Sequence, residues 1–245
     1  MHVVAVVAAG GQGTRLSAAV PKQFLELNGR SLLERSIDAL SASPRIGHII
    51  VALPAAQAAW PPSYLRRPNV TVVEGGLRRQ DSVANAANAA PADTDIVLVH
   101  DAARPFVDVA TIERVIDAAA EAGAAIAALP ARDTVKLADI TETSWVGTEF
   151  GDPLPAVRPK RVPAVKRTLP RETIYLAQTP QAFRRDVLAR VLELGAAGAE
   201  GTDEAALAEQ AGCTVLLVAG DARNIKITTD ADLAFARGLL LDPDE

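Results

Sequence analysis

The chain has 245 residues and a formal net charge of −5, which argues against a general nucleic-acid-binding protein, because such proteins need a basic surface to neutralise phosphates. Hydrophobic residues make up 49% of it, enough for a sizeable core, so a disordered chain is excluded. The single cysteine rules out an intramolecular disulfide. The first apolar run is too short to cross a membrane and lacks the basic start of a signal peptide. A folded protein of the reducing cytoplasm is therefore expected.

Short apolar segments alternate with helical patterns along the chain. Most of the apolar segments lack polar alternation, which predicts strands buried on both faces. The expected strands span residues 3–8, 48–53, 70–74, 95–100, 124–129, 173–178 and 213–218. Capping side chains mark the beginnings of the clearest helices. These helices are expected at residues 32–40 after Ser31, 109–122 after Asp108, and 203–211 after Thr202.

This alternation predicts the α/β class: a single Rossmann-like domain over residues 1–245, with a doubly wound, mostly parallel sheet. In such sheets ligands bind at the carboxyl ends of the strands. Residues 138–171 interrupt the alternation with five prolines and six basic residues. Prolines at this density do not fit a central strand or a helix interior. Two interpretations stay open for this segment: a flexible surface excursion, or an inserted arm that protrudes and pairs with another subunit.

A glycine cluster ends the first expected strand, in "VVAAGGQGTRL", residues 6–16. It fails the dinucleotide-binding fingerprint, because Leu16 stands where the third glycine belongs and no carboxylate ends the second strand. It fails the Walker pattern as well, since no Gly-Lys-Ser/Thr follows. These mismatches argue against a nicotinamide-dependent oxidoreductase.

Two cations follow the glycine cluster. Arg15 offers a fork of donors for phosphate oxygens, and Lys22 offers a compact charge. Successive glycines let backbone amides approach a phosphate closely. The combination favours a triphosphate cradle over a plain tight turn, which is the alternative interpretation.

The stretch "AAGGQGTR" followed by "PKQF" resembles the signature of the sugar-phosphate nucleotidyltransferase superfamily. Six further stretches follow in order: "GGLRRQDSV" (75–83), "VHDAARPF" (99–106), "ARDTVK" (131–136), "AQTPQAF" (177–183), "GTDEA" (201–205) and "DARNIKIT" (221–228). Together, over about residues 3–237, they resemble the 2-C-methyl-D-erythritol 4-phosphate cytidylyltransferase family. The resemblance implies transfer of CMP from CTP to methylerythritol phosphate, with release of pyrophosphate, in non-mevalonate isoprenoid biosynthesis.

The resemblance also implies the residues of a site. Arg15, Lys22 and Lys226 would be the catalytic residues, with Lys226 on the α-phosphate. CTP would be bound by Ala9, Gly10, Gly11, Gly13, Gly76, Ser82, Asp101 and Ala102. Leu77 departs from those members of the family that carry an acidic residue at its position. Asp101 follows an apolar strand directly and is the candidate Mg²⁺ ligand, with a helix cap or turn as the alternative.

The second substrate would be held by Arg104, Thr134, Arg171, Thr179 and Thr202. In the family the arm crosses to a partner subunit, so the resemblance implies a homodimer whose sites use residues of both chains. The segment before Ile174 is longer than in many members. For this reason Arg167 stays open as the alternative to Arg171.

Two further alternative functions remain open in addition to the oxidoreductase. A cytidylyltransferase for another polyol phosphate, such as ribitol 5-phosphate, would share the nucleotide half of the site. A catalytically inactive nucleotide-binding protein would have little need for the full set of cations and the carboxylate. The chain shows no convincing nucleophile–base constellation, and a substrate phosphate that is already ionised near neutral pH would need none.

Overall fold

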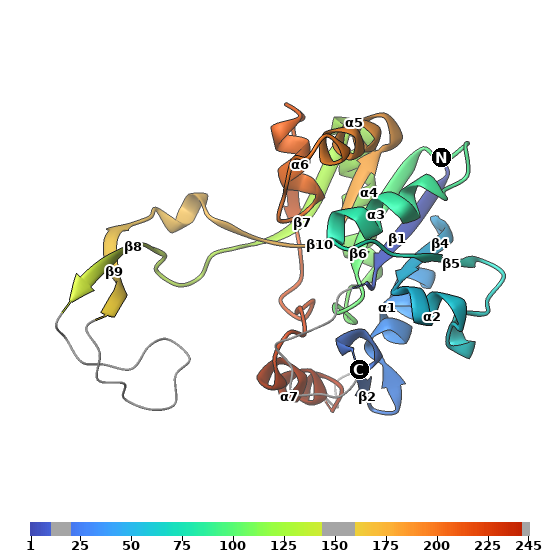
Figure 1. Ribbon diagram of the computed structural model, residues 1–245, viewed down its shortest axis with the longest axis horizontal. Helices are drawn as coiled ribbons and strands as arrows, with labels where there is room; N and C mark the ends of the chain where they lie inside the picture. The colour runs from blue at the N-terminus through green and yellow to red at the C-terminus, as the bar shows by residue number, and fades with distance from the viewer. Residues whose placement is uncertain (11–20, 144–159, 242–245) are drawn as a thin grey trace. The chain divides into compact units, whose positions relative to one another are not determined.

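The computed structural model describes residues 1–10, 21–143 and 160–241. These fall into two compact units, one formed by Met1–Leu129 with Ala177–Glu245 and the other by Pro130–Leu176 (Figure 1). In the described part of the chain, every helix is too short or too polar to cross a lipid bilayer.

The larger unit is built on a seven-stranded sheet with the strand order β11-β7-β10-β6-β1-β4-β5. Its strands are β1 (Val3–Ala8), β4 (Ile46–Leu53), β5 (Val70–Glu74), β6 (Ile96–Asp101), β7 (Ala124–Pro130), β10 (Tyr175–Arg184) and β11 (Leu216–Ala219). The pairs β1–β4, β1–β6, β4–β5 and β7–β11 are parallel, whereas β10 runs antiparallel to β6. The expected mostly parallel α/β sheet is confirmed.

Helices cover both faces of this sheet (Figure 1). They are α1 (Leu32–Ser41), α2 (Ala55–Ala59), α3 (Arg79–Asn88), α4 (Val109–Ala122), α5 (Arg185–Ala196), α6 (Glu204–Gln210) and α7 (Asp230–Leu239). Alternate residues of β1 enter two separate cores, because successive side chains of a strand point to opposite faces. Val7 belongs to the core that contains Ile37 of α1 and Val115 of α4, and Val6 to the core that contains Val83 of α3. The sheet is therefore doubly wound, as predicted.

The helix caps follow local sequence chemistry. The Ser31 hydroxyl accepts a hydrogen bond from the Glu34 backbone N–H at 3.1 Å, and Asp108 caps α4. The prediction that Thr202 caps the next helix is wrong. Asp203 is the N-cap of α6, and its carboxylate accepts from the Ala206 N–H at 2.9 Å, so the helix begins one residue later than the pattern indicated.

Strand β10 differs most from its expected range, residues 173–178, because it extends to Arg184. The polar residues Gln178 and Gln181 and the intervening proline hid this strand from an apolar pattern. Both glutamines are buried and hydrogen-bonded: the Gln178 side chain donates to the Asp221 carbonyl, and Gln181 donates to the Asp203 carboxylate. These bonds offset the cost of burying two amides in the sheet.

The smaller unit contains an antiparallel pair, β8 (Lys136–Thr143) and β9 (Lys160–Thr168). Residues Lys136–Thr143 and Lys160–Thr168 are therefore regular strands, whereas the choice between a surface excursion and a subunit-pairing arm stays a prediction. Pro163 lies in β9 opposite Ile140. A proline is tolerated in such a pair because both strands of a two-stranded sheet are edge strands. The central part of the predicted arm, residues 144–159, lies outside the described residues.

Candidate active site

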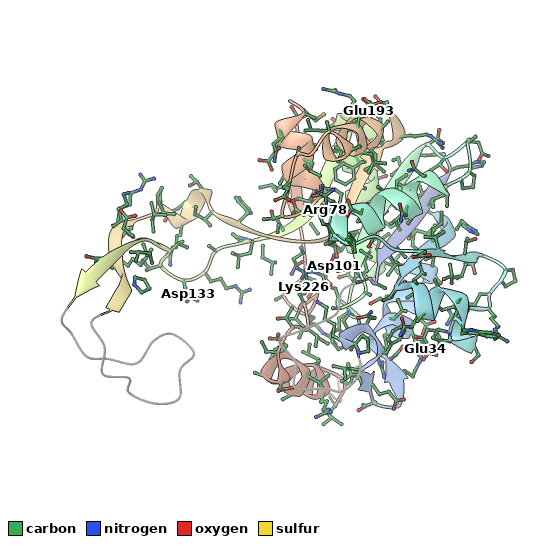
Figure 2. The ribbon with its side chains drawn as sticks, viewed as in Figure 1. Glu34, Arg78, Asp101, Asp133, Glu193 and Lys226 are labelled. Carbon is green, nitrogen blue, oxygen red and sulfur yellow. The ribbon has the colours of Figure 1, made fainter. Side chains whose placement is uncertain are left out.

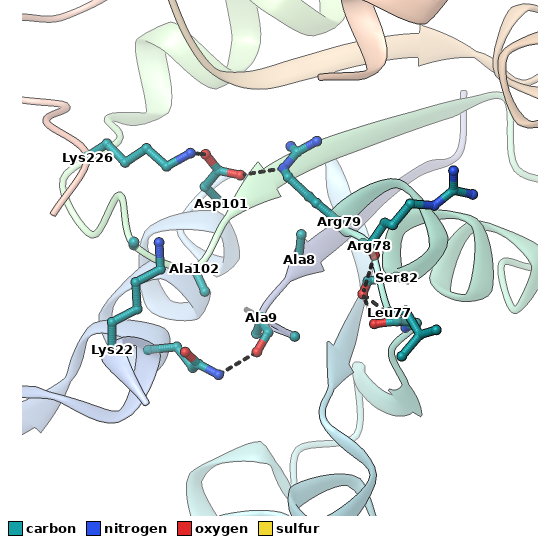
Figure 3. A pocket seen from close by; sticks show the side chains of 14 residues that line it. Ala8, Ala9, Lys22, Leu77, Arg78, Arg79, Ser82, Asp101, Ala102 and Lys226 are labelled. Atoms are coloured by element: carbon teal, nitrogen blue, oxygen red, sulfur yellow. Dashed lines mark hydrogen bonds and ion pairs between the residues drawn. The ribbon is translucent and has the colours of Figure 1, made fainter. Parts of the chain in front are cut away.

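A cavity of about 220 Å³ lies in the larger unit, where β1 and β6 end and α3 begins (Figure 3). It thus occupies the carboxyl ends of parallel strands, as the sheet type predicts. Ten of its lining residues are labelled in Figure 3. The cavity brings together eight predicted site residues: Ala9, Gly10, Lys22, Gly76, Ser82, Asp101, Ala102 and Lys226. These come from five separate stretches of the sequence.

The other predicted site residues have different places. Gly11, Gly13 and Arg15 lie outside the described residues. Arg104 and Thr179 are buried and support Asp101, and Thr202 is exposed just before α6. Thr134 and Arg171 belong to the smaller unit, where both are exposed and Arg171 Nη1 donates to the Arg132 carbonyl at 2.9 Å. Arg167, the alternative to Arg171, is also an exposed residue of that unit, on β9.

Ser82 connects the loops at one end of the cavity. Its hydroxyl accepts from the Gly76 backbone N–H at 3.0 Å and lies 3.2 Å from the Arg78 carbonyl oxygen. A Cβ atom at Gly10 would lie 2.9 Å from the same hydroxyl oxygen, and so would one at Gly75. The loops after β1 and β5 therefore approach this buried serine as closely as they do because both positions are glycine.

Gly76 is the tightest glycine of the site. A Cβ there would overlap Asp81 Cβ and would lie 3.1 Å from the Asp81 backbone carbon. We therefore expect Gly76→Ala to shift the start of α3, lowering the free energy of unfolding by about 1–3 kcal/mol. Ligand binding in the cavity should weaken as well, because Ser82 moves with the helix.

Urea unfolding and calorimetric titration with CTP, the nucleotide that the sequence resemblance implies, check the Gly76→Ala prediction. The matched control is Gly238→Ala on α7, where an added Cβ meets no atom within 4 Å. That control should gain up to about 1 kcal/mol of stability, since alanine is the better helix former. Wild-type stability and CTP affinity in Gly76→Ala would contradict the steric argument.

Asp101 is the electrostatic centre of the cavity. It is the last residue of β6, and its side chain is only 10% exposed. Oδ1 lies 3.1 Å from Arg79 Nε, and Oδ2 lies 2.8 Å from Lys226 Nζ (Figure 3). Arg104 Nε stands 3.9 Å from Oδ2. Burial by itself raises the pKa of this carboxyl, but the charges of Arg79 and Lys226 outweigh burial and hold the pKa well below its usual range.

A buried hydrogen-bond chain fixes the backbone behind Asp101. The Asp101 N–H donates to Thr179 Oγ1 at 3.1 Å, and that oxygen lies 3.0 Å from His100 Nδ1. His100 Nε2 lies 3.0 Å from the Arg104 carbonyl oxygen. A carbonyl can only accept, so Nε2 carries the proton and Nδ1 accepts from the threonine hydroxyl. The expectation that His100 is a satisfied core histidine agrees with these contacts.

Burial, together with the charges of Arg104 and Arg79, lowers the pKa of His100 to about 4, although the hydrogen bond to the Arg104 carbonyl and the charge of Asp101 act in the opposite direction. The unfolded chain then binds a proton at a higher pH than the folded protein. Stability is therefore complete above about pH 6.5 and is lost as the pH falls toward 4, by about 3 kcal/mol from this group. In His100→Gln that contribution to the pH slope should vanish. Urea unfolding of both proteins between pH 4 and 8 measures the difference, and identical slopes would contradict the assignment.

Arg79, Glu204 and Gln23 belong to the site but were missed as site residues. Arg79 lines the cavity and bonds both Asp101 and Glu204, whose carboxylate lies 2.5 Å from its Nη1. Gln23 donates to the Ala9 carbonyl at 2.6 Å and so holds the loop after β1. All three lie inside stretches that had been quoted for their motifs. Their side chains face inward only in the folded chain, a fact that spacing alone does not reveal.

The fold and this cavity define an α/β nucleotide-binding protein, with cations and one ionised carboxylate gathered at the strand ends. The family model described as 2-C-methyl-D-erythritol 4-phosphate cytidylyltransferase matches residues 3–149 and 151–242. The chain belongs to this family.

Relatives and solved structures agree with that membership. The 2-C-methyl-D-erythritol 4-phosphate cytidylyltransferase of Solibacter usitatus is 39% identical over 248 residues, covering 96% of this chain and 94% of the relative. The bifunctional enzyme IspD/IspF of Anaeromyxobacter dehalogenans is 44% identical over 246 residues, but the chain spans only 58% of its length. The crystal structure of the cytidylyltransferase from Thermus thermophilus superposes with a TM-score of 0.75 at 34% identity, covering 98% of each chain.

Proposed function

We propose that the protein transfers CMP from CTP to 2-C-methyl-D-erythritol 4-phosphate, releasing pyrophosphate, as a step of isoprenoid precursor biosynthesis. The observation that carries the proposal is the cavity at the ends of β1 and β6, which unites the family's motifs around Lys22, Asp101 and Lys226. The nicotinamide alternative loses its support, because the chain belongs to a cytidylyltransferase family.

The nucleotide end of the site is assigned to the loops that Ser82 joins. Ser82 and the Gly76 backbone would read the cytosine ring, and Ala9 and Gly10 would border it. The charged end of the cavity, at Asp101 and Lys226, would take the phosphates. Gly11, Gly13 and Arg15 complete this assignment by the family motif. Leu77 is fully exposed, so its side chain leaves room for base contacts made by main-chain atoms.

Asp101 is the proposed ligand of a divalent cation, Mg²⁺. Mg²⁺ in nucleotide sites is commonly held by one or two carboxylates together with substrate phosphates, rather than by an all-protein cage. The structure fits that mode, since Asp101 is kept ionised at the cavity wall. Within the described ranges, three or more His, Cys, Asp or Glu side chains do not gather into a metal site. The metal would supply charge neutralisation of the triphosphate.

The chemistry asks the protein for positioning and charge. The substrate's own phosphate oxygen would attack the α-phosphorus, and its second pKa near 6 leaves it largely ionised at neutral pH, so no general base is required. Lys22 and Arg15 would stabilise the charge that develops in the transition state. Lys226 would hold the α-phosphate in line with the attacking oxygen. For this, the ion pair between Lys226 and Asp101 would first have to open.

The family motif assigns Arg104, Thr134, Arg171, Thr179 and Thr202 to the second substrate. Thr202 is exposed beside the start of α6, whereas Thr134 and Arg171 are exposed on the smaller unit. Arg104 is assigned to substrate by the family motif. Its Nη1 donates to the Asn224 carbonyl at 2.8 Å, so in this structure it also braces the segment that carries Lys226.

A homodimer is part of the proposal. The two-stranded sheet of the smaller unit exposes apolar side chains, with Ile140 56% and Val165 65% exposed. Exposed apolar residues on a two-stranded sheet favour an interaction surface, because such a sheet is marginal alone in water. A partner subunit's arm would cover them, and sedimentation equilibrium tests the oligomeric state.

Incubation with each of the four ribonucleoside triphosphates, Mg²⁺ and methylerythritol phosphate tests the reaction by release of pyrophosphate. CTP should be the preferred nucleotide. Ribitol 5-phosphate, assayed side by side, should give much slower release. Pyrophosphate release that does not depend on the alcohol phosphate, or a preference for ribitol 5-phosphate, would contradict the proposal.

A further inference from the structure

Four side chains of alternating charge form a continuous chain beside the cavity. Glu204 at the start of α6 contacts Arg79 Nη1 at 2.5 Å, and Arg79 Nε contacts Asp101 Oδ1 at 3.1 Å. Asp101 Oδ2 then contacts Lys226 Nζ at 2.8 Å. Figure 3 shows the Arg79–Asp101–Lys226 part of this chain. Glu204, Arg79 and Asp101 come from three different elements and Lys226 from the segment between β11 and α7, so only the folded protein assembles the chain.

Glu204 has no role in the proposed reaction. It is 1% exposed and does not line the cavity, although burying a carboxylate is costly. Its Oε1 is buried and unpartnered among the described residues, and its only charged contact there is Arg79. Burial raises the pKa of Glu204, with Arg79 opposing the rise. A carboxylate held in such a place influences the site through its contact with Arg79.

Arg79 divides its guanidinium between two carboxylates. Three cations surround Asp101, namely Arg79, Arg104 and Lys226, while Asp101 has only two oxygens. Without Glu204, Arg79 would have Asp101 as its sole counter-charge in this cluster. Arg79 would then hold the Asp101 carboxylate more tightly, and an incoming cation would have to compete with Arg79 for it.

We propose that Glu204 is a positioning residue: it shares the charge of Arg79 with Asp101, and so keeps Asp101 able to accept a divalent cation with CTP. The inference rests on the assignment of Asp101 as the metal ligand. It predicts that Glu204 governs the coupling between metal and nucleotide binding rather than nucleotide binding itself.

The test measures CTP affinity by calorimetry in the presence of Mg²⁺ and in the presence of EDTA. The gain is defined as the dissociation constant of CTP in EDTA divided by the dissociation constant of CTP in Mg²⁺. It should fall about tenfold in Glu204→Gln. Affinity in EDTA should stay equal or become tighter, because a negative charge has been removed. Glu209→Gln is the matched control, since it makes the same change at an exposed position of α6 and should keep the wild-type gain.

A double-mutant comparison asks whether Glu204 acts through Arg79. In an Arg79→Gln background, adding Glu204→Gln should leave the gain unchanged. Arg79→Gln leaves the buried Glu204 carboxylate without its charged partner, and the double variant removes that carboxylate. Circular dichroism checks that both variants fold, and the comparison between them does not require the Glu204→Gln single variant. A further change of the gain in that background would overturn the inference.

The remaining outcomes separate this inference from the proposed function. If wild type shows a gain that Asp101→Asn removes but Glu204→Gln keeps, the positioning role is wrong and the metal assignment stands. If wild type shows no gain, the metal assignment fails and this inference fails with it. A loss of the gain in Glu204→Gln, but not in Glu209→Gln, supports both.

Discussion

Replacement of Lys22 by alanine is expected to lower kcat by about 100- to 1,000-fold while changing CTP affinity little. Lys22 lies on the turn Lys22–Phe24 and lines the cavity, with its side chain extending toward the Asp101 end (Figure 3). A cation that stabilises charge developing at the α-phosphorus contributes mainly in the transition state, and loss of one such contact typically costs about 3–4 kcal/mol. Steady-state pyrophosphate release and calorimetric CTP binding measure the two effects separately.

Lys22→Arg is the companion variant, because it keeps the charge and changes the geometry. Partial recovery of kcat in Lys22→Arg would show that charge is the larger share of the effect. Turnover in Lys22→Ala equal to that of wild type would remove Lys22 from the mechanism. A large loss of CTP affinity at unchanged kcat would reassign it to ground-state binding.

Asp101→Asn is expected to damage both stability and metal-dependent binding. The change keeps the shape of the side chain but leaves Arg79, Arg104 and Lys226 without their shared carboxylate. Removing one partner of a buried ion pair typically costs about 3–5 kcal/mol. The gain in CTP affinity conferred by Mg²⁺ should also disappear. Urea unfolding and CTP titration with Mg²⁺ or EDTA are the measurements.

A second variant separates the two effects of losing Asp101. Asp101→Asn combined with Lys226→Met removes one of the uncompensated cations, so part of the lost stability should return. The metal-dependent gain should not return with it. A gain restored together with stability would show that Asp101 is needed only for folding.

Residues that are far apart in the chain meet in the larger unit, whereas its strands are marked locally in the sequence. Figure 2 shows Asp101 and Lys226 together in that unit, although 125 residues separate them in the chain. An apolar pattern found β1, β5 and β6 within one residue of their bounds. It missed the second half of β10, because buried glutamines satisfied by hydrogen bonds look polar in the sequence.

The sequence by itself determined the fold class and the sheet type, because the period of apolar residues reports which faces are buried. Most of the cavity residues came from the family resemblance, whose motifs lie next to the strands that end at the site. Only the tertiary structure decided that Arg79 and Glu204 belong beside Asp101. Charged residues on different helices carry no local signal of their partners, since an ion pair depends on distances that the chain closes only when it folds.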